Sequence, residues 1–382
     1  MDGKKGNAIR SIAIITTQAF SMVNFRGVLI QALIKKNIKV YALAPDYTDD
    51  LREKIKEFGA IPVDFSLSRT GMNPVRDMLD VILLSRLLKR IKPDATFSYF
   101  VKAVIYGSAA AWFATVPTRF SMIEGLGYVF MDNKSILLHK RFLRYLLSFL
   151  FKITLRLNKK VFFLNDDDSN LFLKKSLVQR NQISKIDGIG VDLDYYSPVE
   201  PVVKPVSFIL VARMLKEKGV YDFIEAARVV RNLYPETIFI LVGSADLNPG
   251  SVQETELNTW MEEGLIKWIK HTNDVRPYLA KASVFVLPSY YREGLPRSTQ
   301  EAMALGRPII TTDWVGCRET VENGVNGFLI PVKNPEALAQ TMINFIESPE
   351  LISKMGIESR KIAEERFNVH IINKKILEDI DI

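Results

Sequence analysis

The sequence predicts an α/β protein with two domains, each built around a parallel sheet. Three features support this prediction: a length of 382 residues, short apolar segments that alternate with helical patterns, and a proline-rich break near the middle of the chain. Single cores seldom grow beyond about 250–300 residues. With 48% hydrophobic and 25% charged residues, a chain of this length is expected to fold around two cores.

The first half of the chain alternates apolar segments of strand length with longer helical ones. Strands that are apolar on both faces are typical of a parallel sheet covered by helices on both sides. The predicted strands are Ser11–Thr16, Lys39–Ala44, Asp94–Tyr99, Arg119–Ile123 and Lys160–Leu164. The predicted helices are Phe25–Lys36, Pro74–Ile91 and Ala103–Ala114.

A segment with three prolines, SPVEPVVKP at residues 197–205, cannot continue a helix and is predicted to link the two domains. After this segment, strand-like and helical segments alternate again. The predicted elements there are the strands Ser207–Ala212, Thr237–Val242, Val284–Leu287 and Pro308–Thr312 and the helix Val220–Leu233. We therefore expect domains at residues 1–196 and 206–360.

The two halves differ in charge. Residues 1–196 hold 30 Lys and Arg against 18 Asp and Glu, a net charge of +12, whereas residues 197–382 hold 21 against 25, a net charge of −4. A basic domain suits an anionic partner such as nucleic acid, a phospholipid surface or a phosphorylated substrate. The single cysteine, Cys317, excludes an intramolecular disulfide and a multi-cysteine zinc site. The N-terminus does not fit a signal peptide.

Two nucleotide-binding motifs fail in this chain. Glu124-Gly-Leu-Gly-Tyr-Val-Phe130 follows a predicted strand, but Phe130 occupies the third glycine position of the dinucleotide motif. The phosphate-binding pattern G-x-x-x-x-G-K-[ST] does not occur. We therefore expect no bound cofactor.

Two cations follow one strand of the second half. Arg213 and Lys218 lie at the carboxyl end of Ser207–Ala212, the edge at which open α/β sheets bind ligands. Two fixed cations can hold a diphosphate without a metal ion. A solvated basic loop is the alternative.

Two glutamates, Glu293 and Glu301, lie eight residues apart around Pro296. Ser298-Thr-Gln-Glu301 fits a capping box, which would give Glu301 a structural role. It leaves Glu293 unexplained, because that residue precedes the helix. The N-terminus of a helix that follows a strand can bind a phosphate. Carboxylates only accept hydrogen bonds, so they can bind the hydroxyl groups of a sugar.

At these residues the sequence resembles the retaining glycosyltransferases of family 4. Glu293 and Glu301 fit the E-x7-E motif of that family. Further matches are Gly190-Val-Asp192, Asp274-Val-Arg-Pro-Tyr-Leu, Phe285-Val-Leu-Pro-Ser289, Glu301-Ala-Met-Ala-Leu-Gly306-Arg-Pro308 and Asn326-Gly327. The resemblance implies the GT-B fold, in which two Rossmann-like domains face each other across a cleft. It places the nucleotide-sugar on the C-terminal domain and the acceptor on the N-terminal one, with a final helix, here residues 361–382, returning to the N-terminal domain.

The resemblance also implies roles for the residues. Arg213 and Lys218 resemble the pair that neutralises the donor diphosphate. Glu301 resembles the residue that binds the ribose hydroxyls, and Glu293 resembles the residue that holds the donor sugar. The other substrate-binding residues implied are Gly294 and Leu295 through their amides, Pro296 and Ser298 at the helix start, and His271 near the base through its backbone. The chemistry implied is retaining and needs neither a metal ion nor a protein nucleophile.

Three segments of the first half, Asn24-Phe-Arg26, Glu124-Gly-Leu-Gly127 and Phe163-Leu-Asn165, resemble a bacterial subgroup of this family. Its members add an α-1,3-linked N-acetylgalactosamine to an undecaprenyl-diphosphate-linked amino sugar. Many family members carry a His where this chain has Glu124, so the role of that His does not transfer directly. We expect Glu124 to face the cleft as a catalytic residue, with Asn24 and Arg26 binding substrate. A loop carboxylate that caps a backbone amide is the alternative.

Residues 133–165 contain no acidic residue and include a predicted amphipathic helix. One face carries Arg141, Arg144, Ser148, Lys152, Arg156 and Lys159, and another carries Leu138, Phe142, Tyr145, Phe149 and Ile153. Such a pattern fits a helix that lies on anionic lipid, and its uncharged stretch is too short to span a bilayer. An ordinary core-facing helix is the alternative.

We therefore expect a glycosyltransferase that moves a hexosamine, N-acetylgalactosamine, from a UDP-sugar donor to a polyprenyl-diphosphate-linked glycan acceptor in bacterial glycan assembly. It would be peripheral on the cytoplasmic face of the inner membrane. The alternatives are a family 4 enzyme with another donor or a soluble acceptor, and a GT-B nucleotide-sugar epimerase. A nucleic-acid partner is not expected, because the basic half lacks interleaved exposed aromatic residues and a known module.

Overall fold

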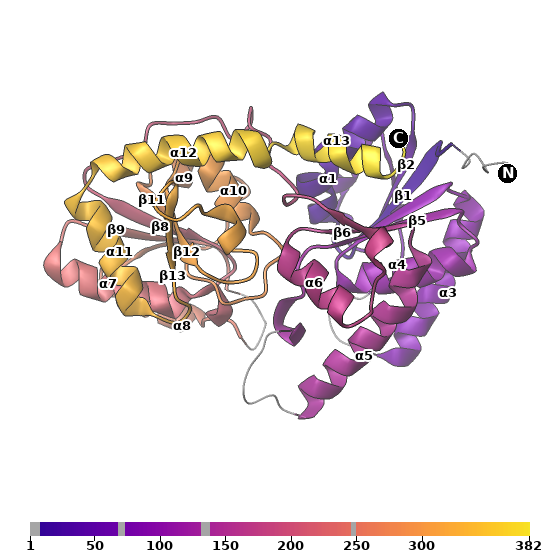
Figure 1. The fold of residues 1–382 in the computed structure, drawn as a ribbon, viewed down its shortest axis with the longest axis horizontal. Coiled ribbons are helices and arrows are strands. Elements are labelled where there is room, and N and C mark those ends of the chain that lie inside the picture. The colour runs from indigo at the N-terminus through magenta and orange to yellow at the C-terminus, as the bar shows by residue number, and fades with distance from the viewer. Residues whose placement is uncertain (1–7, 68–72, 131–137, 246–249) are drawn as a thin grey trace. The chain divides into compact units, whose positions relative to one another are not determined.

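The computed structural model of the protein describes residues 8–67, 73–130, 138–245 and 250–382. The chain divides into two compact units (Figure 1). Unit 1 comprises Met1–Ile186 and His370–Ile382, and unit 2 comprises Asp187–Val369. Both units are parallel α/β structures, as the alternation of apolar and helical segments predicted.

Unit 1 is built on a seven-stranded parallel sheet in the order β3-β2-β1-β4-β5-β6-β7. Its strands are β1 (Ser11–Ile15), β2 (Lys39–Ala44), β3 (Ile61–Asp64), β4 (Ala95–Tyr99), β5 (Thr118–Ile123), β6 (Lys160–Phe163) and β7 (Ile183–Lys185). Its α-helices are α1 (Ala19–Lys35), α2 (Asp49–Glu57), α3 (Pro74–Ile91), α4 (Val101–Phe113), α5 (Leu138–Thr154), α6 (Asp166–Lys174) and α13 (Val369–Asp379). The short 3-10 helices are η1 (Gly127–Phe130), η2 (Leu155–Leu157) and η3 (Arg180–Gln182).

The strand order determines which helices share a face of this sheet. From β1 to β3 the chain moves along the sheet in one direction, and from β3 to β7 it moves in the other. Right-handed crossovers therefore place α1 and α2 on one face and α3, α4, α5 and α6 on the other. In Figure 1, α1 and α13 lie together on one face, and α3, α4 and α5 lie on the opposite one.

Unit 2 is built on a six-stranded parallel sheet in the order β10-β9-β8-β11-β12-β13. Its strands are β8 (Ser207–Val211), β9 (Ile238–Val242), β10 (Lys267–Ile269), β11 (Val284–Leu287), β12 (Ile309–Thr312) and β13 (Gly327–Ile330). Its helices are α7 (Val220–Leu233), α8 (Glu254–Glu262), α9 (Arg276–Ala280), α10 (Arg297–Ala304), α11 (Pro335–Glu347), α12 (Glu350–Arg366), η4 (Lys216–Lys218) and η5 (Arg318–Thr320). Its core contains the stacked rings of Phe208 and Phe239, which pack with Phe223.

The predicted strands are all present, and the structure adds four that the sequence did not indicate, β3, β7, β10 and β13. Two of these, β7 and β10, are only three residues long, and β3 contains Pro62, which is tolerated because β3 lies at the edge of the sheet. Helix α1 begins at Ala19, six residues before the predicted start. The Ala19 amide donates to Asp46 Oδ1 at 2.6 Å, so the start signal comes from the loop after β2.

The proline-rich segment at residues 197–205, predicted as a linker, lies inside unit 2. The fully buried side chain of Arg307 holds it there, because its guanidinium donates to the carbonyl oxygens of Val199, Ala282 (2.7 Å) and Leu305 (3.0 Å). Burial lowers the pKa of Arg307 to about 10. Unit 2 therefore begins at Asp187, before the prolines.

Helix α5 exposes the apolar face that its sequence pattern predicts. The side chains of Phe142, Tyr145, Phe149 and Ile153 are 69%, 76%, 52% and 48% exposed. The helix contacts the core through a different face, with Phe151 fully buried. A core-facing role for the predicted apolar face is therefore wrong. Residues 131–137 of the predicted basic segment, and the side chain of Leu138, lie outside the described residues.

Helix α5 ends at Thr154, so Arg156 lies in η2 and Lys159 follows it. In the described part of the chain, no helix is both long enough and apolar enough to cross a bilayer.

Candidate functional site

The loop after β8 brings Lys218 against the end of β11. Gly219, at φ +77°, makes this approach possible, because a Cβ there would lie 2.1 Å from the carbonyl oxygen of Pro288. The side chain of Lys218 is 14% exposed, whereas Arg213 is exposed. Both predicted cations therefore follow the carboxyl end of β8, as the sequence indicated.

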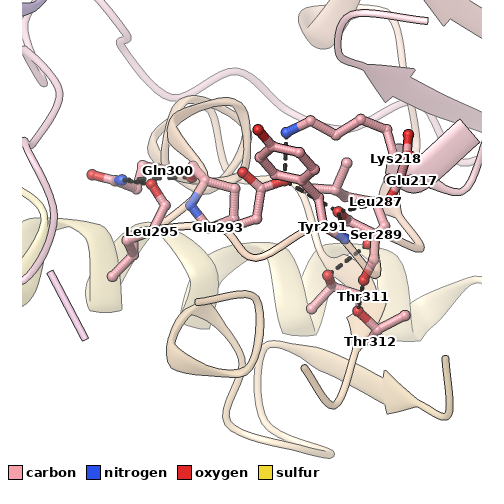
Figure 2. A network of polar contacts seen from close by, with 11 residues as sticks. Glu217, Lys218, Leu287, Ser289, Tyr291, Glu293, Leu295, Gln300, Thr311 and Thr312 are labelled. Atoms are coloured by element: carbon pink, nitrogen blue, oxygen red, sulfur yellow. Dashed lines mark hydrogen bonds and ion pairs between the residues drawn. The ribbon is translucent and has the colours of Figure 1, made fainter. Parts of the chain in front are cut away.

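Lys218 forms an ion pair with Glu293 (Figure 2). The Lys218 ammonium contacts Glu293 Oε1, and the hydroxyl of Ser289 donates to the same oxygen at 3.1 Å. The Glu293 side chain is only 10% exposed. An ammonium carries three donors, so Lys218 can hold Glu293 and still donate to an anionic ligand.

Backbone contacts fix the two loops that supply this pair. The carbonyl oxygen of Glu217 accepts the amides of Tyr290 (2.9 Å) and Tyr291 (3.0 Å) and the Ser289 hydroxyl (3.2 Å). Behind Glu293 lies Gly316, at φ +78°, where a Cβ would be 2.7 Å from the carbonyl oxygen of Glu293. The loop geometry around Glu293 is therefore set by close backbone approaches.

Glu301 lies in α10, and the capping-box interpretation of it is wrong. Helix α10 begins at Arg297 with Pro296 as its N-cap, so Ser298 already lies in the first turn. Glu301 instead pairs with Arg297 Nε at 2.8 Å and accepts a hydrogen bond from the Tyr196 hydroxyl at 2.9 Å. Burial and the nearby Glu301 raise the pKa of Tyr196, so its phenol remains a neutral donor.

The remaining predicted residues of unit 2 differ in their surroundings. Gly294, Leu295 and Pro296 are buried in the segment that joins Glu293 to α10. His271 is exposed, two residues after β10, and among the described residues no contact joins it to the network of Figure 2.

The Gly188–Gly190 turn lies against α10. Gly188, at φ +81°, is so close to Gln300 that a Cβ would lie 2.9 Å from Nε2 of that side chain. The segment carrying the Gly190-Val-Asp192 match and the helix carrying Glu301 therefore lie next to each other in unit 2.

Unit 1 has its own carboxylate–cation pair at the carboxyl edge of its sheet. Glu124 follows β5, and its carboxylate contacts the guanidinium of Arg26 from α1, with side chains 9% and 3% exposed. The guanidinium lies 4.4 Å from the ring centroid of Tyr99 and donates to the sulfur of Met122 at 3.2 Å. Arg26 thus reaches Glu124 through the interior of the unit.

Asn24 does not join this pair. It is exposed on α1, and its amide donates to the Phe20 carbonyl at 2.9 Å. Residues two positions apart on a helix point about 200° apart, so Arg26 faces inward while Asn24 faces outward.

Three residues of the unit 2 site were not predicted: Ser289, Arg297 and Tyr196. Arg297 is four residues before Glu301, a spacing typical of helical ion pairs, and Ser289 ends one of the quoted motifs. These signals could have been used. Tyr196 lies 105 residues from Glu301, and no local pattern indicates the contact.

Among the described residues, no group of three or more His, Cys, Asp and Glu side chains is arranged to hold a metal ion. Lys218 and Arg297 each pair with one of the two predicted glutamates, and Arg213 is exposed in the segment after β8.

Comparisons with known proteins identify the fold and the enzyme class. Residues 205–348 match the family model described as glycosyl transferases group 1. The chain is 27% identical to an N,N'-diacetylbacillosaminyl-diphospho-undecaprenol α-1,3-N-acetylgalactosaminyltransferase of Campylobacter jejuni, over 89% of this chain and 90% of that protein. It is also 27% identical to a UDP-Gal:α-D-GlcNAc-diphosphoundecaprenol α-1,3-galactosyltransferase of Escherichia coli, over 89% of this chain and 91% of that protein.

Solved structures of similar proteins share the fold of the whole chain. HepE of Anabaena, determined with UDP, superposes with a TM-score of 0.75 at 17% identity, covering 97% of this chain and 99% of that one. Sucrose-phosphate synthase of Thermosynechococcus elongatus superposes with a TM-score of 0.76 at 17% identity, covering 97% of this chain and 98% of that one. The chain is therefore a glycosyltransferase with the GT-B fold, and the match to the group 1 family model lies within its second unit.

Proposed function

We propose that this glycosyltransferase transfers N-acetylgalactosamine from a UDP-sugar to an amino sugar carried on polyprenyl diphosphate, with retention of the anomeric configuration. The observation that carries the proposal is the Glu293–Lys218–Ser289 cluster at the carboxyl edge of a group 1 transferase domain. The Campylobacter jejuni and Escherichia coli relatives, which are named for transfer to diphospho-undecaprenol acceptors, support the substrate class.

Lys218 and Arg213 would hold the donor diphosphate. Both follow β8, and charge-assisted hydrogen bonds from them stabilise the negative charge that develops on the leaving UDP. No metal ion is needed for this role. Glu301, kept in place by Arg297 and Tyr196, would accept hydrogen bonds from the ribose hydroxyls.

Glu293 would hold the hydroxyls of the donor sugar. The bond from the anomeric carbon to the phosphate oxygen breaks, and the acceptor oxygen attacks the same face of the sugar. The proton of the acceptor hydroxyl passes to the leaving diphosphate, so the products are UDP and the extended glycan. Glu293 takes no proton in this step, and its contacts with Lys218 and Ser289 keep it in place as an acceptor.

Glu124 of unit 1 would orient the acceptor. Arg26 neutralises its charge from the buried side, and Arg26 itself is held over the ring of Tyr99. In this proposal Arg26 positions Glu124 rather than touching the substrate, and Asn24, exposed on α1, is not assigned to the substrate.

Helix α5 would dock unit 1 on the cytoplasmic face of the inner membrane. Its exposed aromatic face borders a groove of about 450 Å³. The groove is lined by Arg141, Arg144, Tyr145, Ser148, Phe149, Lys152, Lys175 and Leu177. Four cations beside exposed aromatic rings suit an anionic lipid surface, to which each Lys or Arg contributes about 1 kcal/mol.

A donor and acceptor screen tests the proposed reaction. UDP-N-acetylgalactosamine, UDP-galactose and UDP-N-acetylglucosamine would each be incubated with and without polyprenyl-diphosphate-linked amino sugars, and the products separated by thin-layer chromatography. We expect acceptor-dependent transfer of N-acetylgalactosamine. Release of UDP and free sugar at the same rate without an acceptor would favour the epimerase, and transfer to a soluble sugar alone would favour a soluble acceptor.

A charge-neutralised variant tests docking through α5. Changing Arg141, Arg144, Lys152 and Arg156 to Gln should release the protein from anionic vesicles and slow transfer to a long-chain acceptor, while slow hydrolysis of the donor stays unchanged. High salt should likewise weaken the binding of the parent protein to anionic vesicles. Undiminished sedimentation of this variant with vesicles would contradict docking through α5.

A further inference from the structure

Helix α3 exposes an apolar face to solvent. Its side chains are large: Val75 is 66% exposed, Met78 60%, Leu79 51%, Ile82 41% and Leu83 50%. They recur at intervals of three and four residues, which places them on one side of the helix. The opposite side, with Leu84 and Leu88, packs into the core of unit 1.

The acidic residues of α3 lie on its buried side, and its basic residues lie on the exposed side. Both acidic residues, Asp77 and Asp80, are 4% exposed, and Asp77 accepts hydrogen bonds from Lys102 (3.1 Å) and Tyr106 (2.9 Å) of α4. The exposed charges are all positive: Arg76, Arg86, Lys89 and Arg90. Within the described residues, none of these four cations forms an ion pair. The outer surface of α3 is therefore apolar and basic.

The same layer of helices contains α5. Helix α4 packs against both α3 and α5 and is largely buried, with small residues along its middle turns. Helices α3, α4 and α5 lie on the same face of the sheet (Figure 1), so the exposed apolar side chains of α3 and α5 belong to one layer of helices in unit 1. Trp112 and Phe113, at the end of α4, are also exposed on this layer, at 50% and 55%.

We propose that the outer face of α3 is a second lipid-contacting surface, so that unit 1 lies on an anionic bilayer through two helices. The inference rests on the proposed membrane docking through α5. Contact through two helices fixes an orientation that contact through one helix cannot, because a body held along a single line can still rotate about it.

Charge complementarity favours lipid over a second copy of the chain. In a two-fold interface the same patch faces itself, so the four exposed cations of α3 would meet like charges with no acidic side chain of α3 available to pair with them. Anionic headgroups supply the missing negative charge, while the five apolar side chains enter the acyl boundary.

The test uses a triple variant with a matched control. Met78→Gln, Leu79→Gln and Ile82→Gln remove the apolar face from exposed positions. The control changes Val229→Gln and Leu233→Gln, which are 47% and 62% exposed on α7 of unit 2. Binding is measured by sedimentation with vesicles of phosphatidylglycerol and phosphatidylcholine in equal amounts. We expect at least about tenfold weaker binding for the α3 variant and no change for the control. Transfer to a water-soluble acceptor and the melting temperature should be unchanged.

A labelled variant tests the contact directly. Cys317 is fully buried, so a cysteine placed at Leu79→Cys or Leu233→Cys is the reactive thiol. An environment-sensitive fluorophore at position 79 should shift to the blue on anionic vesicles, and one at position 233 should not.

The outcomes separate this inference from the proposed function. If the α3 variant binds vesicles as the parent does while the α5 variant does not, the α3 surface is overturned and docking through α5 stands. If the α3 variant changes only the sedimentation coefficient of the free protein, the face is a contact between copies, and the inference is equally overturned. Glycosyl transfer is assayed separately on the soluble acceptor.

Discussion

Both units place a carboxylate–cation pair at the carboxyl edge of a parallel sheet, but the two pairs are built differently. In unit 1, Arg26 is 3% exposed, extends from a helix and lies over a buried tyrosine ring. In unit 2, Lys218 lies in η4 and Glu293 in the loop before α10, and the lysine side chain is 14% exposed. The buried arginine fixes one conformation of Glu124. The lysine, with three donors and a flexible stem, can exchange partners when a diphosphate arrives.

The outer helices of the two units differ as well. Helix α7 of unit 2 exposes Glu225 beside Arg228, a mixture of charges typical of a solvated surface. Helix α3 of unit 1 buries both of its acids and exposes apolar and basic side chains. The same fold thus carries a solvated surface on one unit and, as we propose, a lipid-facing surface on the other.

The largest effect is expected from a substitution of the buried cation of unit 1, and it is an effect on stability. Arg26→Met leaves Glu124 unpaired in the interior and should reduce the free energy of unfolding by about 3–5 kcal/mol. Scanning calorimetry measures it. The exposed pair in the same unit supplies the control: Arg52→Met, which removes the contact with Asp64, should cost less than about 1 kcal/mol.

The double variant Arg26→Met with Glu124→Gln removes the unpaired charge and should recover most of the lost stability. A double variant no more stable than Arg26→Met alone would mean that the packing of Arg26 on Tyr99, and not its charge, stabilises the unit.

The next largest effect is on catalysis in unit 2. Glu293→Ala should lower the rate of transfer at least about a hundredfold and leave UDP affinity within about threefold, because its partners are sugar hydroxyls. Glu301→Ala should instead weaken UDP binding by about tenfold. Initial rates and calorimetric titration with UDP separate the two. Similar mild losses in both variants, with lowered melting temperatures, would mean that both glutamates serve only the structure of the loop.

A smaller effect is expected for the cations of the same site. Lys218→Met and Arg213→Met each remove a charge-assisted contact to the diphosphate and should cost about 1.5–3 kcal/mol in transfer. Lys216→Met, an exposed lysine of the same turn, is the control and should be neutral. Transfer should also survive EDTA. Inhibition by EDTA that Mg²⁺ or Mn²⁺ reverses would show that a metal ion holds the diphosphate.

The smallest expected effect concerns a carboxylate of unit 2 whose Oδ2 has no hydrogen-bond partner among the described residues. Burial, and next Glu225, raise the pKa of Asp222 from 3.8 to about 6. The folded state therefore binds a proton that the unfolded state has released, so stability falls as pH rises from about 4 to 6. Asp222→Asn removes this loss and should raise the melting temperature at pH 7.5 by at most about 2–3 °C, because the group is only partly buried. At pH 4 the variant and parent should melt together, and an equal gain at both pH values would contradict the assignment.

Local patterns were sufficient for much of the architecture. The helix predicted at Pro74–Ile91 is α3 with the same bounds, and the strands Lys39–Ala44 and Val284–Leu287 are β2 and β11. These segments are long or strongly apolar, so propensity and burial agree. The start of α1 was misplaced because its first amide is capped by Asp46, a residue of another loop. Similarly, the capping box at Ser298 had the right residue types, but Pro296 starts the helix earlier.

Local sequence patterns were enough to predict nine of the strands, the cations that follow β8 and the two glutamates eight residues apart, because each depends on neighbouring residues. The contacts between distant residues depend on the tertiary fold. Lys218 and Glu293 are 75 residues apart and Tyr196 and Glu301 105 apart, and nothing local encodes those contacts. The local sequence of α3 likewise does not determine which of its faces is exposed. That helix is apolar on more than one side, and packing against α4 decides which side is buried and which remains on the surface.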